Sequence, residues 1–312
     1  MLVSARKRTF TKSIRKHGVL YAMTLPGLVF FLLFNYLPLS GIILAFKDFN
    51  VGEGIWGSPF ISPITKNIEF FITSPQAWRA TRNTLILNAL MILFGIVFEV
   101  GLAIILNEIK NRYFKKAVQS VILLPFFVSW IVVSMFVYAV FNVDYGVMNS
   151  LRAVFGAAPI DWYNNAGYWP LIMVAISKWK ISGYNTMIYL AVLSGADQSY
   201  YESARIDGAS TWKQILHISL PYLASTMTVL TLFSIGRIMN ADFGMFYAIV
   251  GENSLLYPTV DVIDTFIYRS LRKLGDVGMS SAVGLFQSLI GFALVLISNV
   301  FARKYQSEGS IF

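Results

Sequence analysis

Long apolar segments separated by shorter polar ones dominate this chain. A helix needs about 20 apolar residues to cross a hydrocarbon layer of roughly 30 Å. Six segments reach that length: residues 19–46, 84–107, 117–142, 168–194, 219–250 and 282–302. Charged or polar residues interrupt the fourth and fifth segments, so hydropathy supports those two less strongly. The pattern predicts an all-α integral membrane protein with six transmembrane helices, flanked by a basic tail at 1–18 and a short tail at 303–312.

The polar segment at 199–221, between the fourth and fifth apolar segments, has the pattern of a capped helical hairpin. Its residues 199–202 (SYYE) and 211–214 (TWKQ) each match a capping box, which opens a helix. Gly208 stands where a left-handed C-terminal cap is expected, and Pro221 is expected to end the second helix. The sequence therefore predicts two short helices that meet at a tight bend.

Composition agrees with a membrane protein, because 56% of the residues are hydrophobic and only 13% are charged. A water-soluble domain of 312 residues needs more polar surface than this. The chain has no cysteine, so it has no disulfide framework and no thiolate metal site, and its two histidines leave little for a metal centre. We expect no metal site.

The distribution of Lys and Arg predicts the orientation. If the N-terminus is cytoplasmic, 14 of the 25 basic residues fall in cytoplasmic segments and eight in the opposite loops. This bias places both termini and the 199–221 hairpin in the cytoplasm. The basic start and the apolar segment after it resemble a secretory signal peptide. However, the segment is too long, contains Pro26 and Pro38 and lacks a small-residue cleavage site, so we expect a retained span. The net charge of +9 reflects this bias beside anionic lipid, and we expect no nucleic-acid partner.

The usual catalytic motifs are missing from the sequence. There is no Gly-Lys dipeptide and hence no Gly-x-x-x-x-Gly-Lys phosphate loop, no His-Glu-x-x-His and no Gly-x-Ser-x-Gly. We therefore expect no enzyme activity and no cofactor in this chain.

At the hairpin the chain resembles the integral-membrane permease subunits of ATP-driven, binding-protein-dependent bacterial importers. Their signature runs Glu-Ala-Ala, Asp-Gly-Ala, an apolar residue, then Ile-x-Leu-Pro. The matching residues are Glu202, Ala204, Asp207, Gly208, Ala209, Ile215, Ile218, Leu220 and Pro221. The chain departs at Ser203, where Ala is preferred, and at Ile215, where Phe is common. An inert connecting loop and a DNA-binding helix-turn-helix are the competing interpretations, and the flanking spans leave no free recognition helix for the second.

The resemblance implies an assembly in the bacterial cytoplasmic (inner) membrane. It implies a second, homologous permease subunit, two ATPase subunits that hold ATP and magnesium, and an extracytoplasmic solute-binding protein. The hairpin would be the coupling helix that seats on an ATPase. The residues carried over to that contact are Glu202, Ala204, Asp207, Gly208, Ala209, Ile215, Leu220 and Pro221.

Several other segments are similar to the branch that imports oligosaccharides, including permeases for acidic polysaccharide fragments such as alginate. These segments are residues 21–50, the loop LNEIKNRYFKK, LLPFFVSW at 123–130, DVIDTFIYRSLR and AVGLFQS. The resemblance implies a sugar as the transported substrate, and we expect an oligosaccharide.

Five ionisable residues lie within the apolar segments: Glu99, Lys178, Lys180, Arg237 and Asp242. A charge at membrane depth costs about 2.5 to 3.5 kcal/mol on insertion scales, so it usually faces a cavity or a partner. Three cations against two anions favour a substrate with carboxylates. The alternatives are that Glu99 and Asp242 pair with these cations, within the protein or across a subunit contact, or that Lys178 snorkels toward the membrane surface. The residues expected to line a sugar pathway are Lys178, Trp179, Tyr184, Asn185, Arg237, Asn240 and Phe243.

Two rival functions and one open question about the loops remain at this point. An ion- or proton-coupled secondary transporter also places charges in the membrane, but it needs no ATPase-docking hairpin and usually has internal repeats. A membrane-embedded enzyme needs a catalytic constellation. The aromatic-rich loops at 47–83 and 143–167 fit either a docking surface for a binding protein or interfacial aromatic belts.

Overall fold

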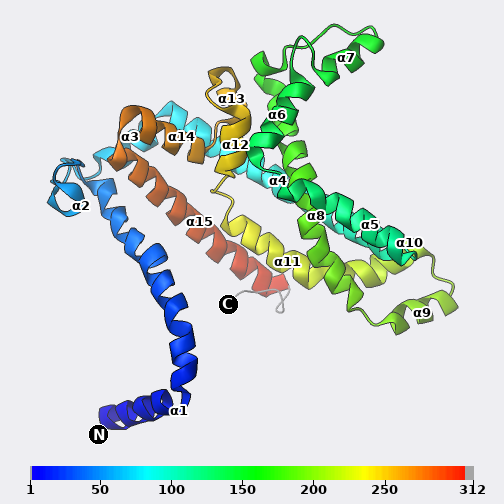
Figure 1. The fold of residues 1–312 in the computed structure, drawn as a ribbon, viewed down its shortest axis with the longest axis horizontal. Coiled ribbons are helices and arrows are strands. Elements are labelled where there is room, and N and C mark those ends of the chain that lie inside the picture. Colours follow the sequence, from blue (N-terminus) through cyan, green and yellow to red (C-terminus); the bar gives the residue numbers. More distant parts are fainter. Residues whose placement is uncertain (1, 306–312) are drawn as a thin grey trace.

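The computed structural model describes the backbone of residues 2–305 and the side chains of residues 16–69, 71–273 and 275–300. Within them the regular secondary structure is helical apart from one isolated bridge between Lys47 and Phe60. Four long helices form the body: α4 (Pro75–Glu108), α8 (Trp169–Ser194), α11 (Leu220–Gly236) and α15 (Val277–Tyr305). A fifth long helix, α1 (Leu2–Phe31), extends away from this body (Figure 1). The α1 helix changes direction at His17 and continues as π and 3-10 turns to Phe46. The basic tail expected at 1–18 is thus helical from Leu2 onward, whereas residues 306–312 of the expected C-terminal tail lie outside the described residues.

The short helices gather at two opposite ends of the body (Figure 1). One end carries α2 (Gly54–Gly57), α3 (Lys66–Thr73), α7 (Val147–Val154), α13 (Tyr257–Val260) and α14 (Ile263–Arg269). The other end carries the start of α1, the end of α15, α9 (Gln198–Ile206) and α10 (Thr211–Gln214). The hairpin expected from the sequence therefore lies at the same end as both termini.

Helices α4 and α8 form the centre of the molecule, with α5 (Arg112–Leu123) against α8. A Cβ atom built at Gly183 of α8 would lie 1.9 Å from the backbone carbonyl oxygen of Ile122. A glycine is therefore needed where α8 crosses the end of α5, as is common where helices in membranes approach closely.

The third apolar segment, expected as one span, is bent. It consists of α5, a 3-10 turn at Leu124–Phe127 and α6 (Trp130–Phe141), with 97° between the two helical parts. Pro125 opens the 3-10 turn, and the side chain of Ser129 caps the start of α6 by accepting from the backbone N–H of Val132. The proline and the cap together explain why the helix restarts in a new direction.

The fifth segment, expected as one span over 219–250, is also broken. Helix α11 ends at Gly236, and α12 (Phe243–Val250) begins after a short non-helical stretch. By length and composition, four continuous helices among the described residues can cross a membrane: Lys16–Phe46, Pro75–Glu108, Thr211–Gly236 and Val277–Val300. The bent pair is a fifth, and α8, with its polar interruptions, falls outside this criterion.

The hairpin differs from expectation in its capping residues. Asp197 rather than Ser199 caps α9, and Ser210 rather than Thr211 caps α10, each through its side-chain oxygen. The helix also does not stop at Pro221. It passes through a π turn at Ile215–Ser219 directly into α11, and Pro221 takes a first-turn position that needs no N–H. Gly208 has a φ of +74°, as the expected left-handed cap requires.

Candidate substrate cavity and coupling surface

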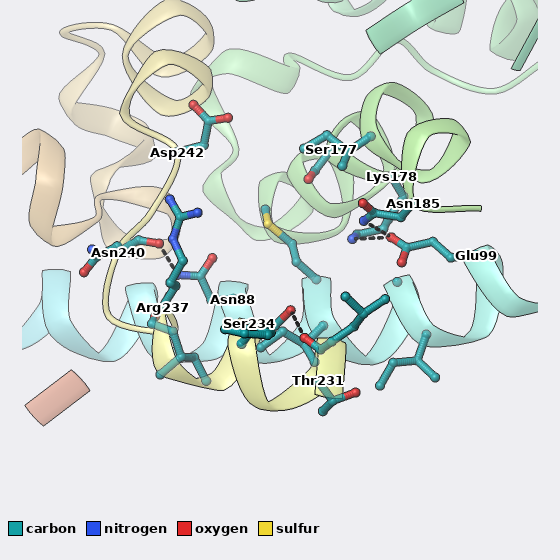
Figure 2. Close-up of a pocket in the computed structure, with 18 of the residues that line it drawn as sticks. Asn88, Glu99, Ser177, Lys178, Asn185, Thr231, Ser234, Arg237, Asn240 and Asp242 are labelled. Atoms are coloured by element: carbon teal, nitrogen blue, oxygen red, sulfur yellow. Dashed lines mark hydrogen bonds and ion pairs between the residues drawn. The ribbon is translucent and has the colours of Figure 1, made fainter. Parts of the chain in front are cut away.

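A cavity of about 660 Å³ opens between α4, α8, α11 and the segment that leads into α12. Its polar and charged lining residues are Asn88, Glu99, Ser177, Lys178, Asn185, Tyr189, Thr231, Ser234, Arg237, Asn240 and Asp242. Figure 2 shows two groups of these side chains on opposite sides of the cavity, with Thr231 and Ser234 on the α11 wall between them. Apolar side chains such as Met91 and Ile181 fill the remaining lining. A cavity of this kind, apolar with a few polar groups, is typical of a small-molecule site.

One group is an ion pair with an amide beside it. The ammonium of Lys178 lies 3.5 Å from Oε1 of Glu99, and Asn185 donates to the same oxygen over 2.9 Å. Both charged side chains are largely buried. The carboxylate of Glu99 is therefore satisfied within the protein, which is the pairing that the sequence left open.

The other group surrounds the break between α11 and α12. Asn88 of α4 donates to the carbonyl oxygens of Ile238 (2.8 Å) and Asn240 (3.3 Å), and Asp264 of α14 accepts from the N–H of Ala241 (2.8 Å). Gln287 of α15 donates to the carbonyl of Met239. Side chains from three helices thus satisfy the backbone that the break leaves unpaired, as a non-helical segment at membrane depth requires.

Asp242 accepts hydrogen bonds within the protein, whereas Arg237 has no partner among the described groups. The Oδ2 of Asp242 accepts from the indole N–H of Trp130 (2.8 Å), and its Oδ1 caps α12 by accepting from the N–H of Met245 (3.1 Å). Arg237 is exposed and points into the cavity in Figure 2, and its guanidinium has no hydrogen bond or ion pair with the groups that the structure describes. It is the cation in this cavity that is free to meet a ligand.

Lys180 lies elsewhere, against the bend of the third segment. Its ammonium donates to the carbonyl of Phe126 (2.7 Å) and lies 5.1 Å from the ring of Trp130. The expected excess of three cations over two anions is therefore wrong for the cavity. Its lining holds two cations, Lys178 and Arg237, and two anions, Glu99 and Asp242, so the formal charges balance.

The structure brings together four of the seven residues expected to line a sugar pathway: Lys178, Asn185, Arg237 and Asn240. The three expected aromatic residues lie outside the cavity. Trp179 is 52% exposed on α8, Tyr184 stacks on Phe126 with 4.6 Å between ring centroids, and Phe243 stacks on Tyr247. Sequence reasoning placed aromatic rings beside the charges by proximity along the chain, but neighbours on a helix face different directions.

Sequence reasoning missed the uncharged polar lining residues Asn88, Ser177, Thr231 and Ser234. The sequence did offer a signal for Asn88, because an amide side chain within an apolar segment usually has a hydrogen-bond partner. The hydroxyl residues had none, because they can bond to their own helix, as Ser234 does with the carbonyl of Leu230. Among the side chains that the structure describes, no group of three or more His, Asp or Glu residues could hold a metal ion.

The α9–α10 hairpin presents a second candidate surface at the opposite end of α8 from α7. Glu202, Asp207 and Gly208 are exposed, whereas Ala204 and Ala209 are half-buried. Ile215 and Leu220 are also half-buried, and Pro221 is exposed. The turn is closed by a bond from the N–H of Ala209 to the carbonyl of Ala204 (2.8 Å).

Large apolar side chains project from this hairpin, with Ile206 87% and Trp212 66% exposed. Below them, the hydroxyl of Tyr201 meets that of Ser219 over 3.1 Å and joins α9 to the start of α11. These two apolar side chains stand among exposed polar ones such as Glu202 and Asp207, on a surface that is joined to α11, a wall of the cavity.

Comparison with known proteins gives a consistent result. The chain is similar to Protein LplB of Bacillus subtilis, with 34% identity over 99% of this chain and 96% of that protein. It is also 34% identical to the polygalacturonan/rhamnogalacturonan transport system permease protein YteP of the same organism, over 97% of this chain and 93% of the relative. Among solved structures, it resembles a chain of a bacterial ABC transporter involved in the import of the acidic polysaccharide alginate. That likeness has a TM-score of 0.87 at 30% identity and covers 96% of this chain and 99% of the other.

The model of one protein family matches residues 99–307, which include the cavity walls α8 and α11 and the whole hairpin. The chain belongs to the family of binding-protein-dependent transport system inner membrane components.

Proposed function

We propose that this chain is the permease subunit of an ATP-driven importer that moves an acidic oligosaccharide across the bacterial cytoplasmic membrane by alternating access. The observation that carries the proposal is the free guanidinium of Arg237 in a polar cavity whose other charges are occupied. A guanidinium binds carboxylates in a bidentate geometry, which suits a uronate. The likeness to an alginate importer and to a polygalacturonan/rhamnogalacturonan permease supports this substrate class.

The neutral polar residues of the cavity complete the site that we propose. Asn88, Asn185 and Asn240 offer amides and Thr231 and Ser234 offer hydroxyls, which are suitable partners for sugar hydroxyl groups. The ion pair of Lys178 and Glu99 keeps the side of the cavity between α4 and α8 neutral in net charge. Arg237 then supplies the preference for a carboxylate.

The hairpin is the proposed coupling helix. Its exposed apolar side chains and its tight turn fit a groove on an ATPase, and α10 continues without a stop into α11. Closure of the two ATPase subunits would move the hairpin, tilt α11 and change the access of the cavity. Hydrolysis of ATP then belongs to the partner, which holds the nucleotide and magnesium.

The assembly that follows has a second permease subunit, two ATPase subunits and an extracytoplasmic solute-binding protein. A structural neighbour at 30% identity and a TM-score of 0.84 is a bacterial alginate ABC transporter in complex with an alginate pentasaccharide-bound periplasmic protein. Both termini and the hairpin face the cytoplasm in this proposal, in agreement with the bias of Lys and Arg. The end with α2, α3 and α7 faces the binding protein.

Substitution of Gly208 tests the coupling. Its left-handed φ of +74° tolerates Asn but strains a β-branched residue, and the space around it is open. We expect Gly208→Val to abolish co-purification of the ATPase and ATP-dependent uptake, with Gly208→Asn close to wild type. If both variants keep the ATPase and transport normally, the coupling role is wrong. Uptake driven by an ion gradient without ATP would instead favour a secondary transporter.

A further inference from the structure

Helix α12 has two faces of different character. One face carries Met245, Phe246, Ile249 and Val250, which are between 1% and 7% exposed and belong to the core beneath α6. Phe243 and Tyr247, one turn apart on the same helix, are 36% and 38% exposed. The outward rings are therefore not needed to fill the core.

The outward rings form an ordered array with Tyr268 of α14, which we call the aromatic ladder (Phe243, Tyr247 and Tyr268). Phe243 and Tyr247 stack with 5.1 Å between centroids and 14° between planes. Tyr268 tilts against Phe243 and Tyr247 at 5.0 Å from each. The array fixes the ring planes in advance, so a ligand would bind with little loss of side-chain entropy.

The ladder begins where the cavity ends. Phe243 directly follows Asp242, which lines the cavity, and α12 then leads away from the hairpin toward α13 (Figure 1). Beyond the ladder, Arg272 follows Tyr268 by four residues in the π turn that continues α14, and it is exposed. The neighbouring Lys273 is paired with Glu252 at 3.1 Å, whereas Arg272 has no ion pair in the part of the chain that the structure describes.

We propose that the aromatic ladder is a second sugar subsite, on which a ring of the acidic oligosaccharide stacks while its carboxylates reach Arg272 on one side and Arg237 on the other. The inference rests on the proposed function and extends its site from the cavity toward the end that carries α13 and α14. A sugar ring presents C–H groups with a slight positive charge to the negative face of an aromatic ring. Two free cations on either side of a stacking surface fit a chain with a carboxylate on each ring.

Ring removal tests the subsite in the assembled importer, reconstituted in proteoliposomes with its partner permease, ATPase and binding protein. The probes are a galacturonate trisaccharide and a neutral maltotriose. We expect Tyr247→Leu and Tyr268→Leu each to raise the KM for the galacturonate trisaccharide about three- to tenfold, the size of an aromatic contact. The matched Tyr247→Phe keeps the aromatic ring and should stay near wild type.

Each other outcome has a definite meaning. Wild-type KM in both leucine variants overturns the subsite. Loss of the second permease subunit from Tyr247→Leu during purification shows that the ladder is a subunit contact, which also overturns it. If wild-type importer takes up neither probe, or only the neutral one, the proposed acidic substrate is wrong independently of the ladder variants.

A labelling experiment gives a readout that does not depend on transport. Because the chain has no cysteine, Tyr247→Cys introduces the one thiol that a maleimide can label in this subunit. We expect the galacturonate trisaccharide to slow that labelling in the complete importer. No protection of Tyr247→Cys at saturating probe would overturn the proposal, as would labelling by a lipid-soluble maleimide only, which would place the ladder against lipid.

Discussion

The ammonium of Lys178 on α8 lies 3.5 Å from the carboxylate of Glu99 on α4, in space that Gly95 leaves open. A Cβ atom at Gly95 would lie 2.8 Å from the Lys178 Nζ and 3.2 Å from the Glu99 Oε1. The ion pair joins the two central helices and forms one side of the cavity. Its two charges cancel at a depth where either one alone would be costly.

Removing one member of this pair should destabilise the protein more than removing both. Glu99→Gln leaves an unpaired, largely buried ammonium, and Lys178→Met leaves an unpaired carboxylate. We expect each single variant to cost about 1 to 3 kcal/mol, because a buried charge is left without its partner. Thermal unfolding of the purified subunit in detergent measures the loss.

The double variant Glu99→Gln with Lys178→Met serves as the control for this prediction. It removes both charges and should recover much of the stability lost in either single variant. A double variant that loses the sum of the two single effects would show that the two side chains act independently.

A glycine pair tests the crossing of α8 and α5. Gly183→Ala places a methyl group against the backbone carbonyl of Ile122, and we expect it to destabilise the protein by about 1 to 3 kcal/mol or prevent folding. Gly101→Ala makes the same change in α4 where nothing lies within 4 Å, and it should be tolerated. The yield of monodisperse subunit in detergent compares the two; equal yields would contradict the close crossing.

The apolar pattern predicted the helical class and the approximate location of the long helices, because hydrocarbon allows few alternatives. It missed the breaks. The signal at Pro125 was visible, but the break after Gly236 depends on Asn88, Asp264 and Gln287, which reach it from distant parts of the chain. A local pattern cannot reveal contacts of that kind.

The candidate site was predicted in part for a similar reason. Charges within apolar segments are rare, so Lys178 and Arg237 stood out and both line the cavity. The direction in which a neighbouring side chain points depends on helix packing, so Trp179 and Tyr184 were assigned to the pathway but lie outside this cavity. The capping boxes failed for another reason, since Asp197 and Ser210 were nearby competing caps of equal quality.

The cap of α9 should make the hairpin sensitive to acid. The N–H of Ser199 donates to the carboxylate of Asp197, and this bond holds the pKa of Asp197 below its ordinary value. A carboxyl group whose pKa is lower in the folded state than in the unfolded state stabilises the fold at pH values above the unfolded-state pKa. That stabilisation is lost as the pH falls through the folded-state pKa. We therefore expect α9 to fray as the pH drops below about 4.

Hydrogen exchange at the backbone amides of α9, measured from pH 6 downward and corrected for intrinsic rates, checks this expectation. Asp197→Asn keeps a capping oxygen but cannot titrate, so its protection should not change over this range. Equal acid sensitivity in the two proteins would assign the fraying to another group.

Arg237 and Lys178 should differ in their effect on substrate choice, although both are cations that line the cavity. Lys178 is held by Glu99, so its loss should disturb the cavity wall and lower uptake of acidic and neutral oligosaccharides alike. Arg237 has no partner among the described side chains, so Arg237→Gln should weaken uptake of a galacturonate oligosaccharide about 10- to 100-fold, as expected for a charge-assisted bond, and change that of maltotriose little. Arg237→Lys keeps the charge but loses the bidentate geometry, and an intermediate loss of galacturonate uptake is expected.

Uptake rates for both sugars, measured below saturation in reconstituted importer, give the ratio of acidic to neutral uptake that tests this prediction. If Arg237→Gln reduces both sugars equally, the guanidinium has a structural role and the preference for a carboxylate must come from elsewhere in the assembly.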